Sequence, residues 1–309
     1  MTFSIVARDP ETGDLGVGVA SKFLAVGSVV SHAQAGVGAV ATQALANFTY
    51  GANGLAILRG GSPADDAVIQ LTEADEGRDH RQLGIVDSNG NAATYTGANC
   101  IDWAGGRTAE GVAAQGNLLA GKQVVDALID TYLAGGLPFP ELLLKSLKAA
   151  DDAGGDRRGR QSCALLVVRE NGGYGGNNDR MLDLRVDDSE NPIDGVGHLL
   201  TLYHLYGDRP RTEELLPIDE TLAAELQRLL EKTGYTPATT TRGSGLAAIV
   251  DSLGVERTGE ARATPDSWDD AWQGAMSEWM SVENLEERMT ASGWLDPRVL
   301  EHLRFRAQQ

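Results

Sequence analysis

Polar and apolar residues alternate from the first positions of the chain. Residues 2–7 read Thr-Phe-Ser-Ile-Val-Ala, and this period of two is typical of a half-buried β-strand. Turn residues at 9–14 and a second, glycine-rich apolar run at 15–20 follow. The pattern therefore predicts a hairpin at the start of the chain, with Thr2 as the first residue of its first strand.

Strand and helix patterns continue to about residue 206. The turn Ser88-Asn89-Gly90 indicates a tight hairpin between two of the strands. Because hairpin-linked strands come in blocks before and after blocks of helices, we expect an α+β fold with antiparallel sheets and helices outside them, and not a parallel βαβ sheet. The expected further strands are 28–34, 38–43, 82–87, 91–96, 111–117, 162–169 and 181–186, and the expected helices are 51–59, 63–73 (capped by Ser62), 122–134, 138–153 and 192–206.

The character of the chain changes after this region. Two prolines among alternating charges predict a linker at 207–217, and residues 218–234 show the apolar spacing of an amphipathic helix. Four of the five tryptophans lie in the last 42 residues, and Trp268 and Trp272 have the spacing of one helix face. We therefore expect a main domain over 1–206, the linker, and a small, mostly helical domain over 218–309 that buries most of its tryptophans.

Composition narrows the classes of partner. The chain has 309 residues and a net charge of −18, which argues against nucleic acid or an anionic lipid surface as a partner. No run of about 18 apolar residues predicts a membrane span, and the first residues carry no signal-peptide pattern. Cys100 and Cys163 are too few for a disulfide framework. Together these features predict a cytoplasmic protein.

The sequence gives no support for a cofactor. The run 36–41 resembles a dinucleotide fingerprint, but no adequate helix begins there and no acidic residue follows at the required place. The five histidines lack the spacing of a metal-binding pair. We expect neither a metal nor an organic cofactor.

Thr2 is the leading candidate for chemistry. If Met1 is removed, as is usual before a small second residue, Thr2 carries a free α-amine beside its own β-hydroxyl. The amine can take the hydroxyl proton during attack on a carbonyl, so the residue needs no histidine partner. Many ordinary proteins also begin Met-Thr and continue as a strand, so the dipeptide alone leaves a purely structural interpretation open.

A second candidate is a loop rich in glycine and arginine at residues 154–162. Arg157, Arg158, Arg160 and Gln161 precede an apolar strand in an otherwise acidic chain. Guanidinium groups together with backbone amides suit a carboxylate or a phosphate. Internal pairing with nearby aspartates explains the same residues equally well, and both interpretations stay open.

Amide side chains gather at the ends of two predicted strands. Gln43 and Asn47 lie where one strand passes into a loop, and Gln115 and Asn117 end another. Such amides can donate to an oxyanion or orient a substrate amide, and each can equally be a hydrogen-bonding loop residue. We treat these four, with the arginine loop, as candidate substrate-binding residues.

Several segments together resemble a known family. They are TFSIVARD at 2–9, VASKF at 19–23, GVGAVATQ at 36–43 and the loop at 154–162. Over residues 2–206 the chain is similar to an uncharacterised bacterial and archaeal family, a domain of unknown function with an Ntn-hydrolase-like (N-terminal nucleophile), proteasome-related fold. The resemblance implies a four-layer αββα sandwich, in agreement with the order of strands and helices.

The resemblance also implies roles for individual residues. In Ntn hydrolases the first residue of the mature first strand is the nucleophile, which here is Thr2. Ser21 and Lys22 end the second strand, where an acidic helper often stands, and Ser31 and His32 lie on the third, where a lysine often stands. Through its charge, Lys22 would lower the pKa of the Thr2 amine. The implied catalytic set is Thr2, Ser21, Lys22 and His32.

The end of the chain resembles a second family, a small peptidoglycan-binding domain. Residues 226–230, 282–288 and 299–304 carry the likeness. The resemblance implies a glycan as partner of the C-terminal domain.

Two functions follow from these features. The first is an amidohydrolase that cleaves a small amide through an acyl-enzyme at Thr2 and uses the arginine loop for an anionic part of its substrate. The second is an inactive scaffold that binds a small anion or a glycan through the arginine loop and the tryptophan-rich tail. Retention of Met1 would favour the second, and the sequence leaves self-association open.

Overall fold

The computed structural model describes residues 2–238 and 257–309. The chain divides into two compact units, unit one (Met1–Leu200) and unit two (Thr201–Gln309). The division falls within helix α6 (Pro192–Gly207). No helix in the described part of the chain combines the length and the apolar character needed to cross a bilayer.

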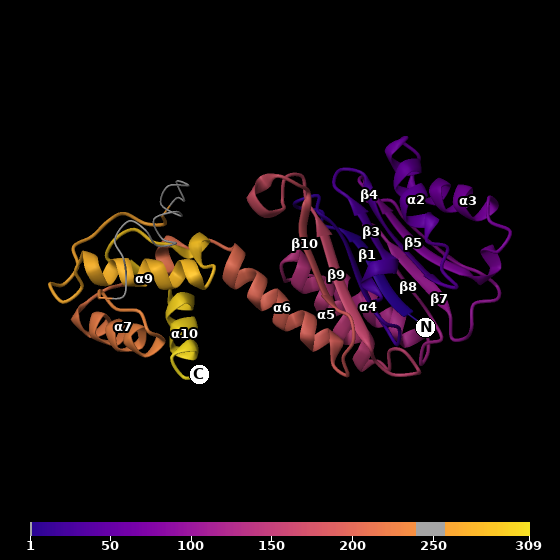
Figure 1. Cartoon of the computed structure of the whole chain (residues 1–309). Helices are drawn as coiled ribbons and strands as arrows, with labels where there is room; N and C mark the ends of the chain where they lie inside the picture. Colours follow the sequence, from indigo (N-terminus) through magenta and orange to yellow (C-terminus); the bar gives the residue numbers. More distant parts are fainter. Residues whose placement is uncertain (1, 239–256) are drawn as a thin grey trace. The chain divides into compact units, whose positions relative to one another are not determined.

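Unit one contains two antiparallel sheets that pack face to face (Figure 1). The strands are β1 (Thr2–Arg8), β2 (Leu15–Ser21), β3 (Ser31–Gln34), β4 (Gly38–Ala44), β5 (Arg81–Asp87), β6 (Ala92–Thr96), β7 (Gly105–Ala109), β8 (Val112–Asn117), β9 (Ser162–Val168) and β10 (Arg180–Val186). The larger sheet has the order β10-β9-β2-β1-β8-β7, and the smaller has the order β3-β4-β5-β6. The predicted antiparallel sheets are therefore confirmed, and the first strand lies inside the larger sheet.

Helices cover the outer faces of both sheets (Figure 1). They are α2 (Thr49–Arg59), α3 (Ala64–Glu73), α4 (Lys122–Ala134) and α5 (Phe139–Asp152). The short helix α1 (Gly27–Val30) instead contacts β2 and β9 of the larger sheet and β4 of the smaller one. Short 3-10 turns lie at Arg78–His80 and Tyr174–Gly176. Helices α4 and α5 pack on β1, β2 and β8, while α2 and α3 pack on β3 to β6. In α4, Val124, Leu128 and Ile129 are buried at helical spacing, which explains why this segment is a helix with one face against a sheet.

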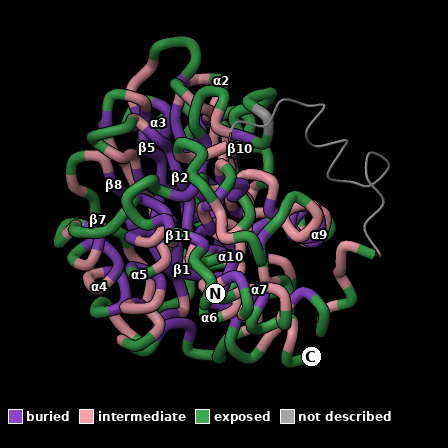
Figure 2. Tube along the Cα trace, turned by 90° about the vertical axis from the view of Figure 1, so that its left-hand side faces the viewer, coloured by how far each residue is buried: buried purple, intermediate pink, exposed green. Residues whose placement is uncertain are grey.

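The first strand is buried on both faces and not on one. All residues from Thr2 to Ala7 are buried, and the strands that flank β1 are buried as well (Figure 2). Ile5 faces α5, while Ser4 faces the other sheet. The Ser4 hydroxyl contacts Gln43 of that sheet and Gln115 of its own sheet. The alternating pattern predicted that the polar residues of this strand face solvent. They face the second sheet instead, and therefore lie between the two sheets.

Three local expectations differ from the structure. Residues 28–34 form the short helix α1 before strand β3, and not one strand. Pro63, and not Ser62, is the N-cap residue of α3, because the proline places its own fixed φ just before the first turn. Strand β7 was not expected, because its sequence, Gly-Gly-Arg-Thr-Ala, lacks the apolar alternation that predicts a strand.

Unit two is mainly helical and has its own apolar core. Its elements are η3 (Thr212–Glu214), β11 (Leu216–Pro217), α7 (Glu220–Thr233), α9 (Asp270–Val282), η4 (Glu286–Arg288), β12 (Trp294–Leu295) and α10 (Pro297–Arg306). Asp219 caps α7 through its carboxylate, and Gly234 ends that helix in the left-handed conformation. The end of the segment that we expected as a linker pairs with β12 through β11, so it belongs to this unit.

The tryptophans of unit two divide between core and surface. Trp268 and Trp279 are each 1% exposed, while Trp272 and Trp294 are half-buried. We expected Trp268 and Trp272 to share a helix face, but Trp268 precedes the N-cap of α9 and lies outside the helix. The two rings nevertheless stack, with their centroids 6.4 Å apart. A buried ion pair, Arg288 with Asp296 at 2.6 Å, completes the core.

Candidate active site

A cavity of about 560 Å³ lies at the N-terminal end of β1. Thr2 is 6% exposed and pairs with Asn117 of β8 in the ladder. The segments that follow β2 and β4 form most of the walls. The cavity is lined by Thr2, Phe23, Val26, Val29, Val30, Gln43, Ala44, Leu45, Ala46, Phe48, Arg81 and Arg158.

The structure brings two of the predicted catalytic residues together. The ladder between β1 and β2 places Thr2 beside Ser21, and Thr2 Oγ1 lies 3.1 Å from Ser21 Oγ. Either hydroxyl can donate in this hydrogen bond. Ser21 is 2% exposed, so the position of the Thr2 hydroxyl is set by a neighbour that is itself fixed in the sheet.

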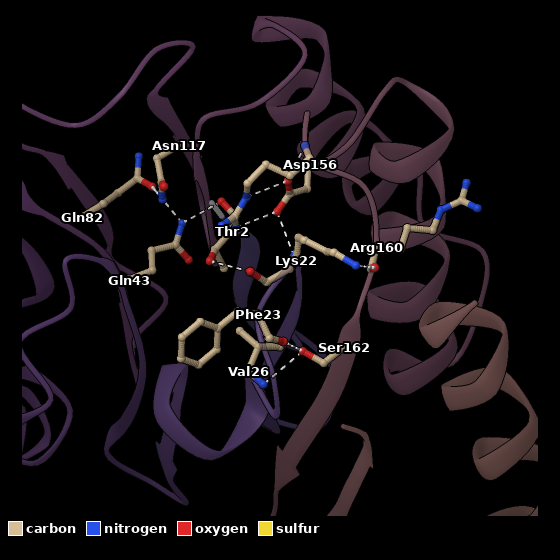
Figure 3. Close-up of polar contacts among 12 residues, drawn as sticks. Thr2, Lys22, Phe23, Val26, Gln43, Gln82, Asn117, Asp156, Arg160 and Ser162 are labelled. Atoms are coloured by element: carbon tan, nitrogen blue, oxygen red, sulfur yellow. Dashed lines mark hydrogen bonds and ion pairs between the residues drawn. The ribbon is translucent and has the colours of Figure 1, made fainter. Parts of the chain in front are cut away.

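Gln43 holds the main chain of Thr2 from the opposite sheet (Figure 3). Its Nε2 donates to the carbonyl oxygen of Thr2 at 3.2 Å and to Gln82 Oε1 at 2.8 Å. Its Oε1 accepts from the Ser4 hydroxyl at 2.7 Å. Since every polar atom of this amide has a partner, Gln43 acts as a fixed link between the two sheets.

Two of the other predicted amides, Gln115 and Asn117, belong to the same network. Asn117 Nδ2 donates to Gln82 Oε1 at 2.9 Å, and Gln115 Nε2 donates to Ser4 Oγ at 2.7 Å. All these side chains are 2% exposed or less. The network is therefore a dry, hydrogen-bonded layer directly below Thr2, and its interior amides are committed to one another.

Close approach of the sheets makes room for this network. Gly84 on β5 lies where a Cβ would come within 2.0 Å of Gln115 Oε1. Any larger residue there would displace the amide. The glycine therefore allows two sheets to close on a polar side chain of this size.

The arginine loop is divided between the cavity and internal ion pairs. Arg158 is 44% exposed at its side chain, lines the cavity and contacts Asp156 at 3.3 Å. Arg160 pairs with Asp151 at 2.9 Å, and Gln161 donates to Asp188 at 3.1 Å. Arg157 is exposed and is not among the lining residues. Arg158 therefore fits both interpretations drawn from the sequence, whereas Arg160 fits internal pairing.

Asp156 connects this loop with the end of β2. Its buried carboxylate accepts from the backbone N–H groups of Lys22 and Arg158, each at 2.8 Å. The sequence offered only one signal for it, an acidic residue within the arginine-rich loop. Its carboxylate therefore fixes the backbone at Lys22, next to Ser21, and at Arg158, whose side chain lines the cavity.

Lys22, His32 and Asn47 do not contact Thr2. Lys22 Nζ donates to the carbonyl oxygen of Arg160 at 3.2 Å and extends away from Thr2 (Figure 3). The His32 ring packs against Gly51 of α2 on the outer face of the smaller sheet, and burial lowers the pKa of its imidazole. Asn47 donates to Asp75 at 3.2 Å. His32 was predicted to be near Thr2, but successive side chains of a strand point to opposite faces of the sheet. The neighbours of His32 on β3 face the other sheet, so His32 itself faces α2.

Sequence reasoning missed several residues of the site. Ser4 and Gln82 complete the amide network, and their signal was a polar residue inside an apolar strand. Arg81 lines the cavity, donates to Asp75 Oδ2 at 2.9 Å and donates to the carbonyl oxygen of Leu45. Arg81 therefore ties one wall of the cavity to the half-buried carboxylate of Asp75.

Within the described residues, no group of three or more histidine, cysteine, aspartate and glutamate side chains could hold a metal ion. The polar side chains that line the cavity carry a hydroxyl (Thr2), an amide (Gln43) and two guanidinium groups (Arg81 and Arg158).

The fold and the site define a protein with two facing antiparallel sheets and a buried threonine at the start of an inner strand. The model of the family of unknown function DUF1028 matches residues 2–196, and the chain belongs to this family. A second model, described as "Putative peptidoglycan binding domain", matches residues 229–303. Both resemblances found in the sequence are therefore confirmed at the level of the family.

A solved structure supports the first of these matches. The chain is similar to protein SPO2555 from Silicibacter pomeroyi, a DUF1028 protein, with 36% identity and a TM-score of 0.60. The similarity covers 66% of this chain and 89% of that one. None of the curated proteins compared matches the chain.

Proposed function

We propose that this protein is an N-terminal nucleophile amidohydrolase that cleaves a small amide through an acyl-enzyme at Thr2. The observation that carries the proposal is the position of Thr2, buried at the head of an inner strand, lining a cavity and with its hydroxyl 3.1 Å from Ser21 Oγ. The two facing sheets with helices on their outer faces agree with the four-layer αββα sandwich of Ntn hydrolases, which we propose as the fold class of unit one.

The proposed reaction uses the amine and hydroxyl of one residue. In a mature chain that begins at Thr2, the α-amine takes the proton of Oγ1 while Oγ1 attacks the amide carbonyl carbon. The C–N bond then breaks, the amine returns its proton to the leaving nitrogen, and an ester of Thr2 remains. Water, deprotonated by the same amine, attacks the ester and releases the carboxylic acid and the free hydroxyl.

Neighbouring residues have positioning roles in this proposal. Ser21 orients Oγ1, and Gln43 holds the Thr2 carbonyl so that the residue cannot rotate away from the cavity. Such fixed geometry lowers the entropy cost of attack. Arg158, at the cavity wall, is placed to stabilise negative charge on the substrate or on the tetrahedral intermediate.

The test uses protein with a C-terminal tag and a set of chromogenic amides. Intact mass should show a chain that begins at Thr2, and an acylating probe should add one acyl group there. Thr2→Ala should lower kcat/KM by at least about 10³-fold, while its circular dichroism stays that of the wild type. Active protein that retains residues before Thr2, or a fully active Thr2→Ala variant, would overturn the proposal.

A second candidate function is a binding scaffold without catalysis. One observation favours it: Arg158 presents a half-exposed guanidinium to the cavity and can recognise an anion whether or not Thr2 reacts. The same intact-mass measurement separates the two, because a retained residue before Thr2 removes the amine that acts as base.

For unit two we propose a glycan ligand, supported by the family match over residues 229–303.

A further inference from the structure

We infer that the cavity at Thr2 recognises an amide that carries an extended apolar group, an alkyl or aryl chain, and this inference rests on the proposed amidohydrolase function. The inference names the class of substrate. It follows from the apolar walls of the cavity, and the reaction at Thr2 does not by itself require such walls.

The floor of the cavity is aliphatic. Val26, Val29 and Val30 lie at and within α1, and all three line the cavity beside Thr2. Val26 and Val30 are 1% and 3% exposed and belong to the apolar core between the sheets. The floor is therefore supported from below by packed side chains and cannot easily turn polar groups toward a ligand.

The rim of the cavity exposes large apolar side chains to solvent. Phe23, Leu45 and Phe48 are 51%, 64% and 58% exposed. They come from two segments, after β2 and after β4, that are distant in sequence and meet at this cavity. Scattered single apolar residues on a surface need no explanation, but a group that rims one cavity beside a candidate nucleophile marks a binding site for apolar material.

The backbone of both rim segments is held in place. The Ser162 hydroxyl donates to the carbonyl oxygen of Phe23 and accepts from Val26 N–H at 3.1 Å (Figure 3). Leu45 N–H donates to the carbonyl oxygen of His80 at 3.2 Å, and Arg81 donates to the carbonyl oxygen of Leu45. These contacts fix the backbone at Phe23 and Leu45, so a ligand does not have to order the backbone there when it binds.

The charged side chains that line the cavity are two arginines from different elements. Of the two arginines that line it, Arg81 is engaged with the Asp75 carboxylate at 2.9 Å. Arg158 lies on the loop next to Asp156. A polyol or a highly charged substrate would leave most of its polar groups against the valine floor without hydrogen bonds, which is costly. An apolar chain matches that floor.

The size of the effect follows from apolar transfer. Each additional methylene placed against the floor should raise kcat/KM about fourfold, which is the fold-change that about 0.8 kcal/mol per buried methylene corresponds to. The rise should end when the cavity is filled.

The test compares two homologous series on the C-terminally tagged protein. One series lengthens the acyl chain of p-nitroanilides from acetyl to octanoyl, and the other lengthens the N-alkyl group of acetamides. We expect the methylene-dependent rise in one series, and the series that shows it assigns the apolar group to the acyl or to the amine side. The rise should flatten in Phe48→Ala, while the control Leu133→Ala, a residue 51% exposed on α4 away from the cavity, should keep it.

Binding to Thr2→Ala separates this inference from the proposed chemistry. Titration calorimetry compares octanoate with acetate, and octylamine with ethylamine. In one of these two pairs, the long ligand should bind at least tenfold more tightly than the short one. If amides are cleaved with no dependence on chain length in either series, the inference is overturned while the amidohydrolase stands. If no amide is cleaved but the chain-dependent binding persists and weakens in Phe48→Ala, the apolar site stands while the proposed chemistry fails. Equal binding of long and short ligands overturns the inference in every case.

Discussion

Asp75 shows how a single half-buried carboxylate shapes this site without lining the cavity. Its carboxylate accepts hydrogen bonds from Arg81, Asn47 and Tyr50. The bond from Arg81 is the largest of the causes that hold the pKa of Asp75 well below its ordinary value. Because Arg81 also donates to the carbonyl oxygen of Leu45, the charge on Asp75 supports the cavity wall.

We expect Asp75→Asn to lower the free energy of unfolding by about 2 kcal/mol at pH 7, since it removes a charged hydrogen-bond partner. An aspartate with a depressed folded pKa contributes stability that is fully present above its unfolded pKa of about 4 and is lost as pH falls toward the folded pKa. Urea unfolding at pH 7 and at steps below pH 4 should therefore show the variant and the wild type converging.

Asp130→Asn is the control, because Asp130 is 61% exposed and pairs with Arg107 at the surface. Its unfolding free energy should stay within about 0.5 kcal/mol of the wild type. A difference for Asp75→Asn that does not change with pH would show that the carboxylate charge is not the cause.

The candidate site was predictable from the sequence only in part. Thr2 and Ser21 come together because adjacent antiparallel strands place them in register, and the ends of strands can be read from pattern. The positions of Lys22 and His32 depend on which way a loop side chain turns and on which face of β3 meets the other sheet. Those depend on packing between distant segments, which a single sequence does not reveal.

Among the elements, the contact between α2 and β3 is unusually close. Gly51 of α2 lies where a Cβ would come within 2.2 Å of His32 Cδ2. In an open helix position alanine is more favourable than glycine by about 1 kcal/mol. Here the imidazole ring occupies the space that the methyl group would need.

We expect Gly51→Ala to destabilise unit one by about 1–3 kcal/mol through overpacking, in spite of its better helix propensity. In α9, the added Cβ of Gly274→Ala would have no described atom within 4 Å beyond the adjacent residues and the helix's own backbone. This substitution should instead stabilise its helix by up to about 1 kcal/mol. Thermal unfolding followed by circular dichroism measures both changes.

A double substitution isolates the cause. In a His32→Ala background the ring is gone, so Gly51→Ala should become neutral or stabilising. If Gly51→Ala destabilises that background as much as the wild type, contact with His32 is not the reason.

Periodicity was sufficient for the longer elements and insufficient for the short ones. Strands such as β9 and helices such as α4 and α5 follow their predicted bounds closely, because several turns or pleats repeat the same signal. Strand β7 and helix α1 have five and four residues. Over so few residues the neighbouring strands and the sheet edge decide the conformation, and the local sequence does not.

At the scale of the whole molecule, the two units carry separate candidate functions. We expect purified cell-wall glycan to bind the full chain saturably. Trp272→Ala should weaken this binding by at least about tenfold, because half-buried aromatic side chains dominate binding where they form the contact. Cosedimentation of the glycan with the protein measures the affinity.

Two controls accompany this measurement. Phe305→Ala alters another exposed aromatic residue of unit two and should leave binding unchanged, and Thr2→Ala should bind glycan as the wild type does. Absence of saturable binding, or equal loss in Phe305→Ala, would contradict a tryptophan-based glycan site.

The order of strands within each sheet was beyond the reach of the sequence. Hairpins such as β1–β2 and β5–β6 could be predicted from turn residues, but the pairing of β1 with β8 and of β2 with β9 joins segments about a hundred residues or more apart. These long-range pairings place Asn117 beside Thr2 and Ser162 beside Ser21. They therefore decide the composition of the site.

The close approach at Gly84 has a consequence for how this family varies through evolution. A side chain at residue 84 would occupy the space that the Gln115 amide fills, so residue 84 cannot enlarge while Gln115 remains. A lineage that enlarges residue 84 must first or simultaneously shorten residue 115, and it then loses a donor to Ser4. Glycine at position 84 and glutamine at position 115 should therefore occur together in relatives. Relatives that lack this pair should have a different hydrogen-bond network beneath the N-terminal threonine.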